Sequence, residues 1–295
     1  MTEKARGVIR DTNIVGGSEK CTASSRIALL GPEAYLTELE VIRENPTSLV
    51  HVAEIACPIH GRIQAFVKTF PAKFVETALA NELAAYLLAC AAQLAVADQA
   101  YVLILRTEQL FKVHPEFKVE LVNEHGLSYA WVTKAIDGPP LRLLHQINEP
   151  ELQKRLRKWP LLPRVLAFDD LVANEDRSHD NLIAIQNGKF ALVDHAEIAG
   201  GVARIDEFLD PTISSKNQLL SMLYGNTVPQ NVSSGMMLAA ERHVEIFQQI
   251  EPELKYWYDK LFPDSEARGH ALLSFLNERA RNSVPRIRQQ QGLLL

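Results

Sequence analysis

The sequence predicts an α+β protein of two lobes: a small mixed β-sheet plus helix N-terminal lobe, and a mainly helical C-terminal lobe. Three observations lead to this prediction. Segments in which apolar and polar residues alternate lie before residue 137, and such alternation is typical of strands. Longer runs with helical periodicity dominate after residue 138. Between the two regions, Asp137-Gly138-Pro139-Pro140 combines residues that interrupt regular secondary structure.

The composition is that of an ordinary globular protein. The chain has 295 residues, 47% of them apolar, and a formal net charge of −5, which does not favour a general nucleic-acid-binding surface because such a surface needs a basic face. Residues 1–10 contain no apolar signal core, and no run reaches the roughly 18 apolar residues of a membrane span. The three cysteines form no disulfide framework and no metal-binding pair, so we expect a reducing, cytoplasmic location. They are Cys21, Cys57 and Cys90.

The N-terminal lobe is expected over residues 31–137, after a loosely ordered segment, 1–30, that is polar and mixed in composition. A helix is predicted at 73–92, because this segment is rich in Ala and Leu and contains neither Gly nor Pro. The first two predicted strands are separated by Pro58–Gly61 and therefore form a hairpin. The predicted strands are 49–56, 62–68, 101–105 and 128–134.

The C-terminal lobe is expected over residues 138–295. Asn187-Gly188 between two short apolar runs predicts a second hairpin, with strands at 181–185 and 189–193, because Asn-Gly readily adopts the tight turn between antiparallel strands. Helical patterns account for most of the remainder. They lie at 141–159, 164–173, 215–224, 232–250, 251–261 and 265–282.

The polar residues that indicate chemistry concentrate between Phe168 and Asp194. Asp176 and Asn181 are five residues apart, and Asp194 follows one predicted hairpin later. Carboxylates that converge beside a core repel one another unless a cation neutralises them, and Asp and Asn oxygens suit Mg²⁺. In phosphoryl transfer, one Asp orients the acceptor hydroxyl, while an Asn and a second Asp hold the metal. The alternative is a charged loop whose side chains only form caps and turns.

A lysine and a glutamate upstream complete this pattern. Lys68 ends an apolar strand, and Glu82 falls on the apolar stripe of the following helix. A carboxylate in that position is partly buried and needs a partner, and Lys68 is the nearest candidate. Phosphoryl-transfer enzymes use such a lysine on the phosphates and such a carboxylate to hold it.

At these residues the sequence resembles the HipA-like kinases, which share their catalytic loop with the phosphatidylinositol 3/4-kinase-like enzymes. The resemblance is carried by Asn174-x-Asp176-Arg177-x-x-x-Asn181 and by the strand end Val193-Asp194-His195. It extends upstream to AFVK (65–68) and NELAAYLLA (81–89), so it covers about residues 40–200 in the order of the family.

The resemblance implies a bilobal protein-kinase-like fold that binds ATP with Mg²⁺ and phosphorylates a hydroxyl acceptor, first of all a Ser or Thr of a protein. Lys68 would contact the phosphates and Glu82 would position it. Asp176 would be the catalytic base, and Asn181 and Asp194 would hold the metal. The hinge strand facing adenine with its backbone would contain Tyr129, Trp131, Val132 and Thr133.

The sequence departs from the pattern of the family in the loop expected to cover the phosphates. This loop, Arg43–Val50, contains no glycine. Thr47 and Ser48 could still offer amides and hydroxyls to phosphate in a turn. The alternatives to a protein kinase are a lipid or small-molecule kinase on the same scaffold and a non-catalytic kinase-like module that binds a protein partner.

Two basic runs are interpreted as solvated helix faces, with a docking patch for an acidic partner as the alternative. The first contains Lys154, Arg155, Arg157 and Lys158, and the second contains Arg279, Arg281, Arg286 and Arg288 near an unstructured end.

Overall fold

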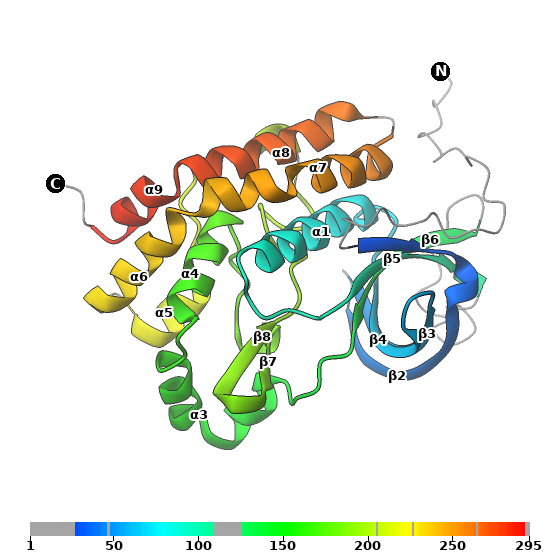
Figure 1. Ribbon diagram of the computed structural model, residues 1–295, viewed down its shortest axis with the longest axis horizontal. Coiled ribbons are helices and arrows are strands. Elements are labelled where there is room, and N and C mark those ends of the chain that lie inside the picture. The colour runs from blue at the N-terminus through cyan, green and yellow to red at the C-terminus, as the bar shows by residue number, and fades with distance from the viewer. Residues whose placement is uncertain are drawn as a thin grey trace.

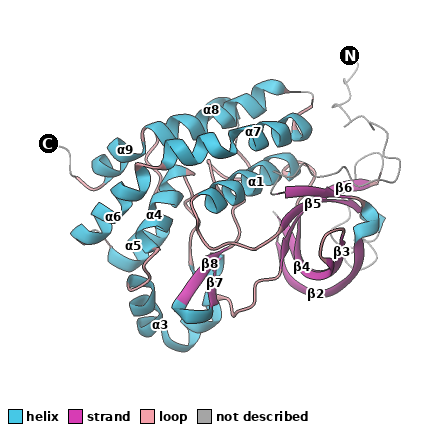
Figure 2. Ribbon diagram, viewed as in Figure 1, coloured by secondary structure: helices cyan, strands magenta, loops and turns pink. Residues whose placement is uncertain are grey.

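A computed structural model describes residues 27–45, 48–108, 126–204, 206–225, 227–263 and 265–292. Within these residues the chain is α+β, as predicted, with a six-stranded mixed sheet, a two-stranded hairpin and eight α-helices. Figure 2 shows that the strands and most of the helices occupy different sides of the molecule. The described part contains no helix that is long and apolar enough to cross a membrane.

The large sheet has the strand order β1-β5-β6-β4-β3-β2. Only the β1–β5 pair is parallel; the other neighbours run antiparallel. The sheet curls strongly in Figure 1, with β2, β3 and β4 wrapped into a half-barrel. Its strands are β1 (Ile27–Leu30), β2 (Tyr35–Asn45), β3 (Ser48–Cys57), β4 (Gly61–Thr69), β5 (Ala100–Arg106) and β6 (Leu127–Lys134).

The four strands predicted before residue 137 are confirmed as β3 to β6, and the β3–β4 hairpin is paired in register from Leu49↔Thr69 to Cys57↔Gly61. The expected loose segment was wrong at its end, because residues 27–30 form β1; residues 1–26 lie outside the described residues. Strand β2 was not predicted. It is an edge strand whose pairing with β3 shifts register three times, and such irregularities interrupt the two-residue period by which strands are recognised.

Helix α1 (Val75–Ala91) lies between the sheet and the C-terminal helices. The sequence predicted a single apolar stripe, but nearly the whole circumference is buried, from Thr77 to Ala89 without interruption. A helix apolar on all sides is typical of the inside of a protein. One side of α1 packs against the sheet, where Tyr86 meets Trp131 edge-to-face, and another packs against α7.

The C-terminal region is helical, as predicted, but two of its boundaries were wrong. A helix was expected over 232–250 and another over 251–261; instead the first ends at Ala240, and the next runs unbroken from His243 through Pro252. The short last helix was not predicted. The helices are α3 (Leu141–Arg157), α4 (Leu162–Leu171), α5 (Gln218–Tyr224), α6 (Gln230–Ala240), α7 (His243–Leu261), α8 (Glu266–Arg281) and α9 (Ser283–Gln290).

The second hairpin is confirmed as β7 (Leu182–Ile185) and β8 (Lys189–Leu192). Its connection has three residues, Gln186–Gly188, rather than the two of the predicted Asn-Gly turn. Asn187 and Gly188 have φ of +61° and +68°, a left-handed conformation that Asn and Gly tolerate. The segment that joins the sheet to the helices lies against this hairpin, since Pro139 O accepts from Ala184 N.

Candidate functional site

The centre of the candidate site is Lys68, which lies between two carboxylates. Its Nζ is 3.0 Å from Glu82 Oε1 on α1 and 2.5 Å from Asp194 Oδ1, just after β8. Lys68 is 7% exposed and Glu82 is 1% exposed, so the predicted partnership of these two residues is confirmed. Strand β4, helix α1 and the segment after β8 thus meet at one ammonium group.

The pKa values of Lys68 and Glu82 depend on burial and on the charges of their neighbours. Burial alone lowers the pKa of Lys68, but the charges of Asp194 and Glu82 outweigh it and raise the pKa to about 12. Burial raises the pKa of Glu82, and the negative charge of Asp194 adds to this, while Lys68 opposes both. Lys68 is therefore a cation at neutral pH, and its charge favours the ionised form of Glu82.

Asp194 is held in an uncommon backbone conformation, with φ of +59°. Asp tolerates this left-handed region better than most residues, although at a cost of order 1 kcal/mol. The following amide, His195 N, donates to the second oxygen of Glu82 at 3.1 Å. The bend after β8 thereby ties the backbone to Glu82 while its side chain reaches Lys68.

The loop after α4 brings Asp176 and Asn181 together, as their spacing predicted. Asn181 Nδ2 donates to Asp176 Oδ2 at 3.0 Å and to Asp176 O at 2.8 Å. Asn174 Oδ1 accepts from the amide of Asp176 at 3.0 Å. Asp176 is exposed, whereas Asn174 and Asn181 are buried beneath it. The loop therefore presents one oriented carboxylate to solvent.

Beneath this loop lies Arg177, which is fully buried and anchors the loop through an ion pair. Its guanidinium contacts the carboxylate of Asp169 at 3.1 Å, donates to the carbonyls of Asn181 and Val193, and meets His195 Nδ1 at 3.0 Å. Burial raises the pKa of Asp169. Burial, with Arg177 beside it, lowers the pKa of His195 well below its ordinary range, so this imidazole is neutral.

A pocket of about 280 Å³ opens beside Lys68 and is lined by residues of the large sheet, of helix α1 and of the β7–β8 hairpin. Its floor and walls include Trp131 and Thr133 from β6 and Ile183 and Leu192 from the hairpin. This size is at the lower end for ligand pockets and suits a flat ring better than a whole nucleotide. A larger cavity, about 840 Å³, lies across the joining segment and includes none of Lys68, Glu82 and Asp194.

The expectation that the β6 backbone faces adenine was wrong. From Ala130 to Thr133 this strand is paired with β4 on one side and β5 on the other, so its backbone groups are engaged within the sheet. Trp131 and Thr133 line the pocket through their side chains instead. Val132 belongs to the smaller core on the opposite face of the sheet, and Tyr129 packs against the main core without lining the pocket.

Of the two candidates for contacting phosphate, Ser48 does not line the pocket. Thr47 lies outside the described residues. Ser48 is 2% exposed, begins β3 and is paired with Asn45 of β2. Ser48 is therefore buried at the start of β3 and does not present its hydroxyl to solvent.

Several residues around the pocket were missed by the sequence analysis. Tyr86 lies one helical turn after Glu82 and could have been found from that spacing. Arg142 and Asp180 face each other across the pocket at 3.9 Å, and no local pattern signals a contact between residues so distant in sequence. Glu197 is half-buried, which raises its pKa; Lys68 opposes the shift, and Asp176 and Asp194 add to it.

The residues that the resemblance assigns to Mg²⁺ have suitable donor atoms. Because Asn181 Nδ2 is engaged by Asp176, its Oδ1 is the atom left for a cation, and Asp194 offers a partly exposed carboxylate. In the described ranges no cluster of three or more His, Cys, Asp or Glu side chains is arranged around a metal position. The oxygen atoms of Asn181 and Asp194 fit a hard cation, such as Mg²⁺, that also binds water and phosphate oxygens.

No protein-family model matches the chain, and the search of curated proteins found none similar to it.

Proposed function

We propose that the chain is an ATP- and Mg²⁺-dependent phosphotransferase of HipA-like type, with a bilobal protein-kinase-like arrangement, that acts on a Ser or Thr hydroxyl of a protein. The observation that carries the proposal is the Glu82–Lys68–Asp194 contact, with 3.0 Å and 2.5 Å between the charged atoms. A lysine held by a helix carboxylate beside a metal-binding Asp is the arrangement that phosphoryl transfer uses.

In this proposal each residue has a separate task. Asp176 receives the proton of the acceptor hydroxyl, and Asn181 fixes the orientation of that carboxylate through its 3.0 Å hydrogen bond. Lys68 binds phosphate oxygens, and Glu82 keeps the ammonium in place. Asp194 and Asn181 would hold Mg²⁺, which supplies positive charge to the phosphate oxygens. Catalysis would then consist mainly of positioning and electrostatic stabilisation.

The adenine ring is proposed to enter the pocket beside Trp131 and Thr133. Because the backbone of β6 is engaged by its neighbours, the ring would be held through the side chains of Trp131 and Thr133. Pro140 lines the pocket directly.

A specific observation favours a second candidate, the non-catalytic partner-binding module. Lys68 already neutralises Asp194 at 2.5 Å, and an ion pair of this kind can replace a metal as the partner of the carboxylate. A module that never binds nucleotide would keep the same pair for stability alone. A lipid or small-molecule kinase has no such observation in its favour.

The test compares ATP binding with phosphoryl transfer in wild type and Asp176→Ala. Since Asp176 is exposed and takes no part in the Lys68 contact, the variant should bind Mg·ATP within about twofold of wild type. Transfer to a protein acceptor or to the chain itself should fall about 10²–10⁴-fold. The control is Asp259→Ala, an exposed carboxylate on α7, which should change neither property. Full transfer by Asp176→Ala would refute the assignment of the base.

A further inference from the structure

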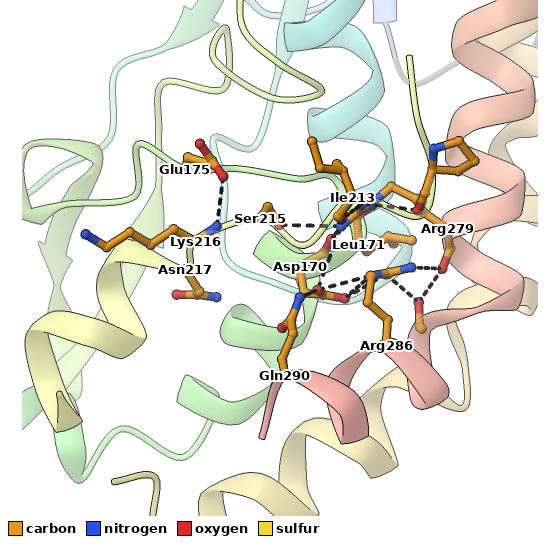
Figure 3. A network of polar contacts seen from close by, with 12 residues as sticks. Asp170, Leu171, Glu175, Ile213, Ser215, Lys216, Asn217, Arg279, Arg286 and Gln290 are labelled. Atoms are coloured by element: carbon orange, nitrogen blue, oxygen red, sulfur yellow. Dashed lines mark hydrogen bonds and ion pairs between the residues drawn. The ribbon is translucent and has the colours of Figure 1, made fainter. Parts of the chain in front are cut away.

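The second basic run was predicted to be a solvated face, and for two of its arginines this was wrong. Arg279 is fully buried and Arg286 is 6% exposed. Both reach back about 110 residues along the chain to the end of α4, as the close view in Figure 3 shows. Arg281, two residues after Arg279, is exposed and donates to Asn277 on its own helix.

The contacts of Arg279 are unusual because almost all of them are to backbone oxygens. Its guanidinium donates to Asp170 O at 2.5 Å and to Leu171 O at 3.0 Å, at the end of α4. It also donates to Pro211 O at 3.3 Å and Ile213 O at 2.9 Å. One side chain thus satisfies the free carbonyls of a helix end and binds a second segment to that end.

Both segments lead to the candidate site. Leu171 precedes Asp176 by five residues, so the end of α4 fixes where the loop of Asp176 begins. The segment that contains Pro211 and Ile213 continues to Lys216, whose amide donates to Glu175 Oε1 at 2.8 Å. Residues 211–217 therefore contact the loop beside Asp176 directly, and Arg279 joins the two behind it.

An ion pair between Arg286 and Asp170 lies beside Arg279. Arg286 contacts the Asp170 carboxylate at 2.6 Å, and Gln290 donates to the same carboxylate at 3.0 Å. Arg286 also donates to Arg279 O at 3.1 Å. Burial lowers the pKa of Arg279 to about 10, with Arg286 adding to the effect, so the guanidinium remains charged at neutral pH.

We propose that Arg279 is a positioning residue for phosphoryl transfer, which holds the loop of Asp176 and residues 211–217 as one unit. This proposal rests on the proposed function of the site. Residues 211–217 lie beside the proposed base rather than in the pocket by Lys68, so they belong to the acceptor side of the reaction. Loss of Arg279 should consequently slow transfer without weakening Mg·ATP binding.

The conservative variant Arg279→Lys keeps the positive charge but removes the planar guanidinium. It tests the proposal because a lysine ammonium cannot reach all four carbonyls that the guanidinium contacts. In Arg279→Lys, kcat should fall about 10- to 100-fold, while the Kd for Mg·ATP stays within about twofold of wild type. The matched control, Arg281→Lys, should change neither value. Arg279→Ala should regain part of its kcat when guanidinium is added at millimolar concentration. A folded Arg279→Lys with wild-type kcat would overturn the proposal, and so would an equal loss of ATP binding.

A second measurement does not depend on activity and separates this proposal from the proposed function. Amide hydrogen exchange in Arg279→Lys should become faster in 171–176 and 211–217 together, and remain unchanged in α1. Faster exchange in only one of the segments, or in neither, would contradict their behaviour as one unit, whether or not the chain transfers phosphate.

If both Arg279 variants fail to fold, Glu175→Ala provides the same test from the other end, because Glu175 is exposed and its loss leaves the buried network intact. It should speed exchange in residues 211–217 and lower kcat at constant Mg·ATP affinity. Unchanged exchange and unchanged kcat would overturn the proposal.

Discussion

Replacing Lys68 by Met removes the cation between the carboxylates of Glu82 and Asp194. Glu82 is the more deeply buried of the two. Met fills similar space, so the main effect is electrostatic. Glu82 is 1% exposed and would be left without its partner, and removing one member of a buried pair costs about 3–5 kcal/mol. Asp194 is partly exposed, so water can compensate for its loss of the ammonium.

The chain can limit this cost by protonating Glu82. Its ordinary pKa is 4.5, and binding a proton at higher pH costs about 1.36 kcal/mol for each pH unit above that value. The ceiling is therefore about 3.4 kcal/mol at pH 7.0 and about 1.4 kcal/mol at pH 5.5. Because burial and Asp194 both raise the pKa of Glu82 in the folded state, the contribution of Glu82 to the stability of the variant is greatest at low pH and is lost as the pH rises.

The assay is urea unfolding followed by tryptophan fluorescence, at pH 5.5 and pH 7.0. Lys68→Met should lose up to about 2 kcal/mol more at the higher pH. The double variant Lys68→Met/Glu82→Gln should lose most of this pH dependence, because it carries no buried carboxylate at position 82. A penalty equal at both pH values, or equal pH dependence in the double variant, would refute this account of the site.

Two further predictions concern the surrounding fold. Gly138→Ala should destabilise the protein by about 2–4 kcal/mol, because a Cβ there would lie 1.9 Å from Ala184 O on the hairpin; Gly61→Ala, where φ is +69° but nothing lies within 4 Å, should cost only about 1–2 kcal/mol in thermal unfolding. Burial lowers the pKa of His243 to about 4, so the unfolded chain binds the extra proton and stability should rise with pH between about 4 and 6.5. His243→Leu should flatten that rise in urea titrations, and an unaltered slope would show that another group causes it.

The parts of the fold that were predictable from sequence are those with strong local patterns. The Asn187-Gly188 turn, the alternating β3–β4 hairpin and the Ala-rich α1 each carry their own signal. The signal failed where tertiary contacts decide the outcome. β2 is an irregular edge strand, and α7 continues through Pro252, which lies on an exposed face.

The site shows the same division between local and distant contacts. Lys68 and Glu82 could be paired from sequence because a buried helix carboxylate needs a cation, and Asp176 and Asn181 from their five-residue spacing. Arg279 could not be linked to α4, since a solvated arginine and a buried one look alike in sequence. The backbone of β6 was misassigned because its pairing on both sides depends on strand order, which periodicity does not report.

The most direct test of the central claim is calorimetric titration of ATP, with and without Mg²⁺, into wild type and Asp194→Ala. We predict Mg²⁺-dependent binding by wild type that is lost or greatly weakened in Asp194→Ala and retained in Asp98→Ala, which removes an exposed carboxylate away from Lys68. Absence of binding by wild type, or equal binding by Asp194→Ala, would contradict a nucleotide site at Lys68 and favour the partner-binding module.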